Sequence, residues 1–236
     1  ASEVGDEPIM IRNRTGCPVV VAPDRVSAAK MLLDRHDCDL IISDDGLQHY
    51  ALDRDLEIAM IDGERGLGNG LCLPAGPLRE PVSRLDEVDL VIVNGGSAPL
   101  QLDIKAPVET MQLVPSRFVN ITTGATQGTD FFAGKQVHAV AGIGNPQRFF
   151  ISLAALGCEL ASRYPFPDHY AFNAQDLAFD DDLPIIMTEK DAVRLSSTGA
   201  LPADTDLWYL EVVAELPLEQ LALLSEKMLF QKIKKG

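Results

Sequence analysis

Short apolar runs that stop abruptly at polar residues recur along this chain and constrain its fold more than any other feature. Runs this short, rich in β-branched residues, are typical of strands buried in a parallel sheet. They lie at 18–22, 40–43, 56–61, 88–94, 136–141, 159–164, 184–187 and 207–213. Helical periodicity separates several of them, at 24–33, 146–156, 174–179 and from 217 onward. Strands alternating with helices predict an α/β protein with βαβ units and a parallel sheet.

The two groups of predicted elements are separated by a weakly patterned stretch, residues 97–124, which carries several prolines and polar residues. This stretch predicts a connecting segment, with extended strands as the alternative. A chain of 236 residues is long enough for one large or two small domains. We therefore expect one domain over 1–110 and a smaller α/β domain over 111–236, with the boundary somewhere in 97–124.

The composition excludes several classes of protein. Hydrophobic residues make up 46% of the chain, which indicates a globular protein. The net charge of −15 argues against sequence-independent binding of nucleic acid, although four lysines between 227 and 235 form either a solvated tail or a local basic patch. The cysteines, Cys17, Cys38, Cys72 and Cys158, show no metal-binding spacing and favour a reducing compartment. No apolar run is long enough to span a bilayer.

Two adjacent carboxylates, Asp44 and Asp45, come after the apolar run Leu40–Ile42 and the polar Ser43. The C-terminal edge of a parallel sheet is where α/β proteins bind ligands. Two like charges at such an edge are unfavourable unless a cation or a donor compensates them. The pattern is that of a Walker B element, whose aspartate holds Mg²⁺ against nucleotide phosphates. The alternative is a solvated pair that caps a turn or a helix.

Further motifs accompany this pair in order along the chain: VGDEP at 4–8, DDGLQH at 44–49, RDL at 54–56, GNG at 68–70, LPAGPLREP at 73–81, AGIGNPQRFF at 141–150, FPDHYAF at 166–172 and MTEKDAV at 187–193. Together they resemble the signature of the tetraacyldisaccharide 4'-kinase (lipid A 4'-kinase) family. The resemblance implies a P-loop-kinase-like parallel sheet flanked by helices, incomplete at its N-terminus, with a second, smaller α/β domain.

The resemblance also implies a reaction. Such a kinase moves the γ-phosphate of ATP, with Mg²⁺, to the 4'-hydroxyl of tetraacyldisaccharide 1-phosphate and forms lipid IVA for lipid A biosynthesis. This implies a lipid disaccharide substrate, peripheral association with the cytoplasmic face of the bacterial inner membrane, and no obligate protein partner. The alternative is a non-catalytic nucleotide- or lipid-binding module that kept the fold.

The catalytic residues implied by the resemblance are Asp6, His169 and Asp44, of which Asp6 and His169 would activate the acceptor hydroxyl. An imidazole paired with a carboxylate can take the proton of an attacking sugar hydroxyl. Asp45 would be the principal Mg²⁺ ligand, and Asp44 would assist. On the expected boundary Asp6 and His169 lie in different domains, so we expect both to face a cleft that closes. From the residues alone, Asp6 is equally well a turn-capping residue and His169 a packed loop histidine.

The substrate-binding residues implied are His49, Arg25, Arg79 and Glu80. Arginine suits this role because its planar fork binds phosphate through two hydrogen bonds. Taken singly, these residues are equally explained as solvated or ion-paired side chains. The chain departs from the family pattern at Tyr170, where a second histidine is expected. Residues 189–191 are predicted either to border a pocket or to cap a helix and form ion pairs.

One expected motif does not occur. The family implies a P-loop, G-x-x-x-x-G-K-[ST], whose backbone amides and lysine hold the ATP phosphates. The glycine-rich stretches at 66–70 and 142–145 lack the required Gly-Lys-Ser/Thr. We therefore expect this chain to be the C-terminal portion of such an enzyme and to be inactive alone.

Overall fold

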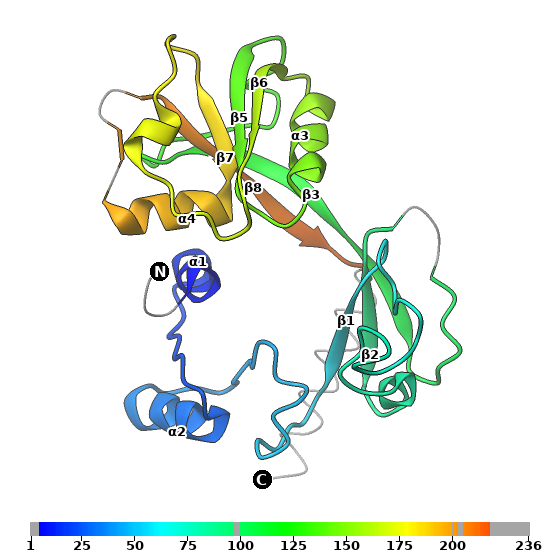
Figure 1. The fold of residues 1–236 in the computed structure, drawn as a ribbon. Helices are drawn as coiled ribbons and strands as arrows, with labels where there is room; N and C mark the ends of the chain where they lie inside the picture. The colour runs from blue at the N-terminus through cyan, green and yellow to red at the C-terminus, as the bar shows by residue number, and fades with distance from the viewer. Residues whose placement is uncertain (1–4, 97–99, 200, 203–204, 218–236) are drawn as a thin grey trace. The chain divides into compact units, whose positions relative to one another are not determined.

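The computed structural model describes residues 5–96, 100–199, 201–202 and 205–217, which divide into two compact units (Figure 1). The larger unit contains residues 1–39 and 115–213, and the smaller unit contains residues 40–114 and 214–236. The division at 114/115 lies within the expected boundary of 97–124. The expected first domain, 1–110, differs from this grouping because residues 1–39 belong with the second half of the chain. The domain assignment of 1–110 and 111–236 stays a prediction.

The larger unit is built on a sheet with the strand order β3–β8–β7–β5–β6. The neighbours β8 and β7, β7 and β5, and β5 and β6 run parallel, which confirms the expected parallel sheet. A short strand, β4 (Thr126–Gln127), pairs antiparallel with β3. The strands are β3 (Val108–Asn120), β5 (Gln136–Ala141), β6 (Glu159–Pro165), β7 (Ile185–Thr188) and β8 (Leu207–Glu215).

Helices cover both faces of this sheet, because the buried strands carry apolar side chains on both sides. Ala139 of β5 belongs to one core cluster with Phe150 and Leu153 of α3 (Pro146–Ala155). The next residue, Val140, belongs to a second core cluster with Leu195 of α4 (Glu189–Thr198). Since successive strand residues point to opposite faces, α3 and α4 lie on opposite sides of the sheet.

The smaller unit has a parallel arrangement of β1 (Ile58–Asp62), β2 (Leu90–Asn94) and the first part of β3. Strand β3 therefore contributes to both units, with residues 108–114 in the smaller one and 115–120 in the larger. The core of the smaller unit gathers Ile61, Val91 and Val93 with leucines from the surrounding loops. A 3₁₀ helix, η1 (Val82–Asp86), precedes β2.

Two more helices belong to the larger unit, α1 (Asp6–Thr15) and α2 (Arg25–Arg35). The predicted helix at 24–33 is confirmed, and the Asp24 carboxylate accepts hydrogen bonds from the backbone N–H groups of Val26 and Ser27. The helix expected at 174–179 is the 3₁₀ helix η2 (Ala174–Leu177). The helix expected from residue 217 and the lysine cluster lie outside the described residues.

The strands predicted at 18–22 and 40–43 were wrong. Neither segment has strand structure, and Ile42 is 85% exposed. A strand requires a neighbouring strand to receive its backbone hydrogen bonds. No described residues pair with these two segments as a strand, so apolar composition alone does not make them strands.

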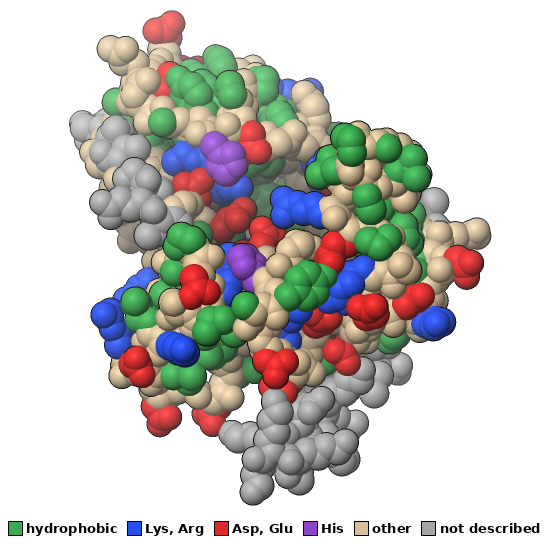
Figure 2. Space-filling view, turned by 60° about the horizontal axis from the view of Figure 1, so that its bottom comes forward, with side chains coloured by type: hydrophobic (Ala, Val, Ile, Leu, Met, Phe, Trp, Pro, Cys, Tyr) green, Lys and Arg blue, Asp and Glu red, His purple; other side chains and the backbone are tan. Residues whose placement is uncertain are grey.

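Charges of both signs are mixed on the face that Figure 2 shows. Figure 2 shows acidic and basic side chains interspersed on one face, with apolar side chains between them. This face therefore carries no continuous basic surface, in keeping with the net charge of −15. Among the helices that the structure describes, none has the length and apolar character needed to cross a membrane.

Candidate active site

Asp6 is the first residue of α1, and the local sequence explains why the helix starts there. Asp6 and Glu7 lie in the first turn, where the helix dipole favours negative charge. Pro8 follows, which fits the first turn because proline has no N–H to bond there. Gly16, with a φ of 67°, ends the helix in the left-handed conformation that glycine adopts without strain. Asp6 is the one buried residue of this helix.

Ion pairs join α1 to α4 within the larger unit. Lys190 Nζ lies 3.0 Å from Glu7 Oε1, and Arg14 Nε donates to Glu189 Oε1 at 2.7 Å. Arg194 of α4 reaches Asp6. The ion-pair role predicted for residues 189–191 is confirmed, whereas the helix is capped by the Thr188 hydroxyl, which accepts a hydrogen bond from the Asp191 N–H.

His169 lies in the loop between β6 and η2, in a conformation that is uncommon for histidine. Its φ is 60°, in the left-handed region, and its backbone N–H donates to Asp168 Oδ1 at 2.9 Å. The flanking aromatic rings of Phe166 and Tyr170 lie 4.6 Å apart and pack on Phe172. The loop is thus fixed by packed rings on either side of an exposed imidazole, which is 67% exposed.

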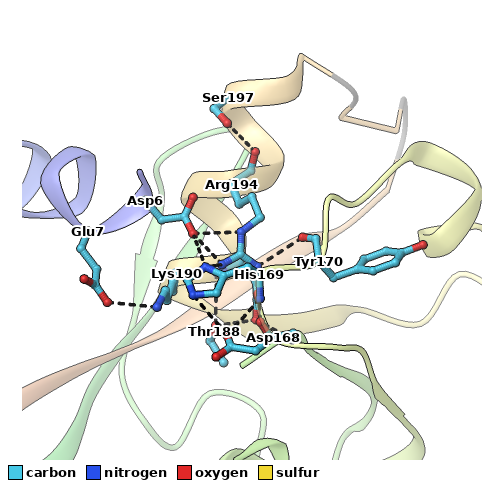
Figure 3. Close-up of polar contacts among 11 residues, drawn as sticks. Asp6, Glu7, Asp168, His169, Tyr170, Thr188, Lys190, Arg194 and Ser197 are labelled. Atoms are coloured by element: carbon cyan, nitrogen blue, oxygen red, sulfur yellow. Dashed lines mark hydrogen bonds and ion pairs between the residues drawn. The ribbon is translucent and has the colours of Figure 1, made fainter. Parts of the chain in front are cut away.

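Asp6, His169 and Arg194 converge on one point (Figure 3). Asp6 Oδ2 accepts hydrogen bonds from Arg194 Nη2 at 2.6 Å and from Arg194 Nε at 3.0 Å. The same oxygen lies 3.6 Å from His169 Nδ1. The expected approach of Asp6 to His169 therefore occurs, but inside one unit, since both residues belong to the larger unit. The expectation that they face each other across a domain boundary is not met.

The charge state of Asp6 follows from its neighbours. Burial acts to raise the pKa of Asp6, but the hydrogen bonds and positive charge of Arg194, with smaller effects of His169 and Lys190, outweigh it. The pKa of Asp6 is therefore held below its ordinary value of 3.8. Asp6 is a carboxylate at neutral pH, so it can orient a neighbouring imidazole and stabilise it when it gains a proton.

Asp191 lies at the bottom of the cluster, and its side chain is fully inaccessible to solvent. Its carboxylate accepts hydrogen bonds from the Thr188 hydroxyl at 2.6 Å, the Gly142 N–H at 3.0 Å and Arg194 Nη1 at 3.1 Å. Burial raises the pKa of Asp191 above its ordinary value, and these hydrogen bonds oppose the shift only in part. Asp191 and Arg194 were not among the predicted site residues.

The smaller unit carries Asp44 and Asp45, which lie in an exposed turn and not at the end of a strand. Asp45 has a φ of 51°, which non-glycine residues seldom adopt outside functional sites and turns. Within the described part of the chain, no three His, Cys, Asp or Glu side chains come close enough to hold a metal ion together. Two adjacent, accessible carboxylates still fit Mg²⁺, which is commonly held by one or two carboxylates together with substrate phosphates.

The remaining predicted residues fall into both units. In the smaller unit, the Glu80 carboxylate accepts hydrogen bonds from Gln48 Nε2 at 2.8 Å and from the Tyr50 hydroxyl. Glu80 thereby fixes the loop that contains His49, whose N–H donates to Gly46 O. Arg79 is exposed. In the larger unit, Arg25 Nη1 donates to Ala22 O at 2.7 Å, beside the start of α2.

Comparison with known proteins agrees with the motifs. A family model described as Tetraacyldisaccharide-1-P 4'-kinase matches residues 1–229. The chain belongs to the tetraacyldisaccharide 4'-kinase family. A "Tetraacyldisaccharide 4'-kinase" of Hahella chejuensis is 55% identical over 213 residues, covering 90% of this chain and 60% of the relative. A protein of the same name from Pseudomonas putida is 53% identical over 215 residues, covering 91% of this chain and 61% of the relative.

The chain thus spans about 60% of the length of these members of the kinase family. A solved "apo" form of LpxK from Aquifex aeolicus in complex with ATP has a similar fold, with a TM-score of 0.75 and 24% identity. The match covers 96% of this chain and 68% of that one. Both the family resemblance and the predicted P-loop-kinase-like α/β fold, a mainly parallel sheet flanked by helices, are confirmed.

Proposed function

We propose that this chain is part of an ATP-dependent kinase that transfers the γ-phosphate of ATP to the 4'-hydroxyl of tetraacyldisaccharide 1-phosphate. The product would be lipid IVA, for lipid A biosynthesis. Family membership supports the reaction, and the fold shared with a protein solved with ATP supports ATP as the donor. Because the chain spans about 60% of the relatives' length, the activity is proposed for a protein of their full length. The observation that carries the proposal is the approach of Asp6 to His169.

His169 is suited to contact the acceptor hydroxyl, and Asp6 is suited to orient and stabilise the His169 imidazole. The His169 side chain is 67% exposed, whereas the Asp6 side chain is 9% exposed. With Nδ1 facing Asp6, the imidazole offers Nε2 to an incoming 4'-hydroxyl. Nε2 would take the hydroxyl proton as the oxygen attacks the γ-phosphate, and ionised Asp6 would stabilise the imidazolium that forms.

Asp45 and Asp44 would hold Mg²⁺ in the smaller unit. When bound, the ion supplies positive charge that neutralises the phosphate oxygens. We propose that His49, Arg25, Arg79 and Glu80 lie around the substrate phosphate, a role that the family resemblance supports. Exposed Arg79 is free to approach such a group in solution, and Glu80 would act by fixing the 48–50 loop through its bonds to Gln48 and Tyr50.

A lipid disaccharide substrate places the reaction at a membrane surface. We propose peripheral association with the cytoplasmic face of the bacterial inner membrane, without an obligate protein partner and without nucleic acid. The absence of a P-loop motif from residues 1–236 supports the further proposal that this chain alone does not turn over. A non-catalytic binding module is the second candidate, favoured by that same absence.

The test is transfer of labelled γ-phosphate to tetraacyldisaccharide 1-phosphate by a full-length protein that contains this chain. His169→Ala and Asp6→Asn should each lower kcat by roughly 10²–10⁴-fold, the usual size of general acid–base effects. His36→Ala, a change at an exposed histidine outside the cluster, should leave kcat within about threefold. Absence of turnover in the wild-type full-length protein would favour the binding module, and full activity of His169→Ala would refute the assigned roles.

A further inference from the structure

Arg194 is the most highly connected side chain at the Asp6–His169 pair, and none of the roles assigned above uses it. Its side chain is only 7% exposed. The guanidinium donates twice to Asp6 Oδ2 and once to Asp191 Oδ1. It also donates to the backbone carbonyls of Gly142 at 3.3 Å and Tyr170 at 3.2 Å. One planar group thus joins the start of α1, the segment after β5, the His169 loop and α4.

The position of the guanidinium relative to the imidazole is specific. Arg194 Nη2 lies 2.6 Å from Asp6 Oδ2 and 3.5 Å from His169 Nδ1. Asp6 Oδ2 therefore faces the guanidinium and the imidazole together, and its direction is set by two hydrogen bonds from Arg194. An arginine fork can fix an oxygen in this way because its donors are rigidly placed, whereas a lysine ammonium is a single point charge on a flexible stem.

The backbone of His169 depends on the same group. A non-glycine residue at a φ of 60° is strained and persists only where its surroundings hold it. The carbonyl of Tyr170, the next residue, accepts a hydrogen bond from Arg194 Nη1. Arg194 thus restrains both members of the pair, Asp6 through its carboxylate and His169 through the adjoining peptide.

We propose that Arg194 is a positioning residue for phosphate transfer, which fixes the Asp6 carboxylate against the His169 imidazole. This inference rests on the proposed function of the Asp6–His169 pair. The competing explanation is that Arg194 only attaches α1 to α4. That attachment has other contributors, since Arg14 pairs with Glu189 and Lys190 pairs with Glu7. Arg14 does not contact the Asp6 carboxylate in the described structure, so it provides a matched control.

The experiment is a double-mutant cycle in the full-length protein, with kcat measured at saturating ATP and lipid. Arg194→Lys keeps the charge but loses the fork, and it should lower kcat by about 10–100-fold with KM changed less than about threefold. In the Asp6→Asn background the same change should cost less than about threefold, because the group through which it acts is already gone. Arg14→Gln, the control, should leave kcat within about threefold.

The measured losses distinguish a positioning role of Arg194 from simple attachment of α1 to α4. Losses that multiply in the double variant, or an Arg194→Lys variant no worse than Arg14→Gln, would overturn the positioning role. Full activity of Asp6→Asn would instead refute the proposed function of the pair. If Arg194→Lys does not fold, Arg194→Gln replaces it in the same cycle. A loss of kcat in the wild-type background that is absent in the Asp6→Asn background supports positioning, and losses that multiply overturn it.

Discussion

The carboxylates of the larger unit and those of the smaller unit occur in opposite environments. Asp6 and Asp191 of the larger unit are buried and share Arg194, with each oxygen that faces the cluster engaged by a fixed donor. Asp44 and Asp45 of the smaller unit are exposed in a turn. The first arrangement resembles a structural ion network, and the second a site that a cation and a nucleotide would complete.

This contrast predicts whether substitution of each carboxylate affects stability, activity or both. A buried charge whose partner is removed is left uncompensated, so substitution in the cluster should affect stability and activity together. An exposed carboxylate is solvated with or without its ligand, so substitution in the turn should affect activity alone. Measuring both quantities for each variant therefore tests whether the contrast holds.

The largest effect is expected for Asp191→Ala. This change removes the acceptor of the Gly142 N–H and of the Thr188 hydroxyl, and one of the acceptors of buried Arg194 Nη1. The free energy of unfolding should fall by about 3–5 kcal/mol, as for other broken buried pairs. Urea unfolding followed by circular dichroism measures it, with exposed Asp182→Ala as a control that should change by less than about 0.5 kcal/mol. Equal effects of the two variants would contradict the importance of burial.

Asp45→Asn should lower activity and leave stability unchanged. Loss of a metal ligand should lower kcat of the full-length protein by about 100–1,000-fold, equivalent to several kcal/mol of charge neutralisation. The free energy of unfolding should stay within about 0.5 kcal/mol of wild type because the side chain is exposed. Asp55→Asn, an acidic change nearby, should retain activity within about threefold. Comparable activity of the two variants at saturating Mg²⁺ would refute the metal role of Asp45.

A smaller, pH-dependent effect is expected for Asp6→Asn. The pKa of Asp6 is lower in the folded protein than its ordinary value of 3.8, so ionised Asp6 stabilises the fold above that pH. The variant should be less stable than wild type by about 1–3 kcal/mol at pH 7, the usual size for hydrogen bonds to a charged group. The difference should shrink as the pH falls through the folded pKa of Asp6. A gap that is constant from pH 7 to pH 3 would show that the carboxylate charge is not responsible.

The smallest effect concerns the loop beside Asp45. Glu80→Gln removes the charge that binds Gln48 and Tyr50, a partly exposed interaction worth about 0.2–1 kcal/mol. The backbone N–H groups of His49 and Leu52, which donate within this loop, should exchange with solvent about two- to fivefold faster. Hydrogen exchange measures this, with Glu64→Gln at another exposed site as the control. Unchanged exchange would mean that Glu80 does not hold the loop.

Periodicity alone predicted some elements of the larger unit closely and others not at all. The strand at 136–141 was placed to the residue, and α3 begins at Pro146 as expected, with Asn145 capping it. The strands expected at 18–22 and 40–43 did not form, since strand formation depends on a pairing partner that no local pattern reveals. Helix α1 was missed, although acidic residues before a proline mark a helix start.

The site was predictable only in part for a similar reason. Asp6 and His169 were paired through the family resemblance, and no spacing in the chain indicates their approach. The motif at 187–193 stops one residue short of Arg194, and an arginine in a helix is ordinarily a solvated side chain. The signal that could have found Arg194 is helical spacing, because it lies three residues after Asp191 and on the same face.

The way α1 is attached makes the site sensitive to dissolved salt. Asp6 is the one buried residue of this helix, and its partners in α4 lie 188 positions away along the chain. The paired charges of Glu7, Arg14 and Asp6 join this helix to α4. At an ionic strength of 1 M the Debye length falls to about 3 Å, which weakens the exposed pair first and the buried pair last. Rising ionic strength should therefore gradually loosen the attachment of α1 and the position of Asp6 beside the His169 imidazole.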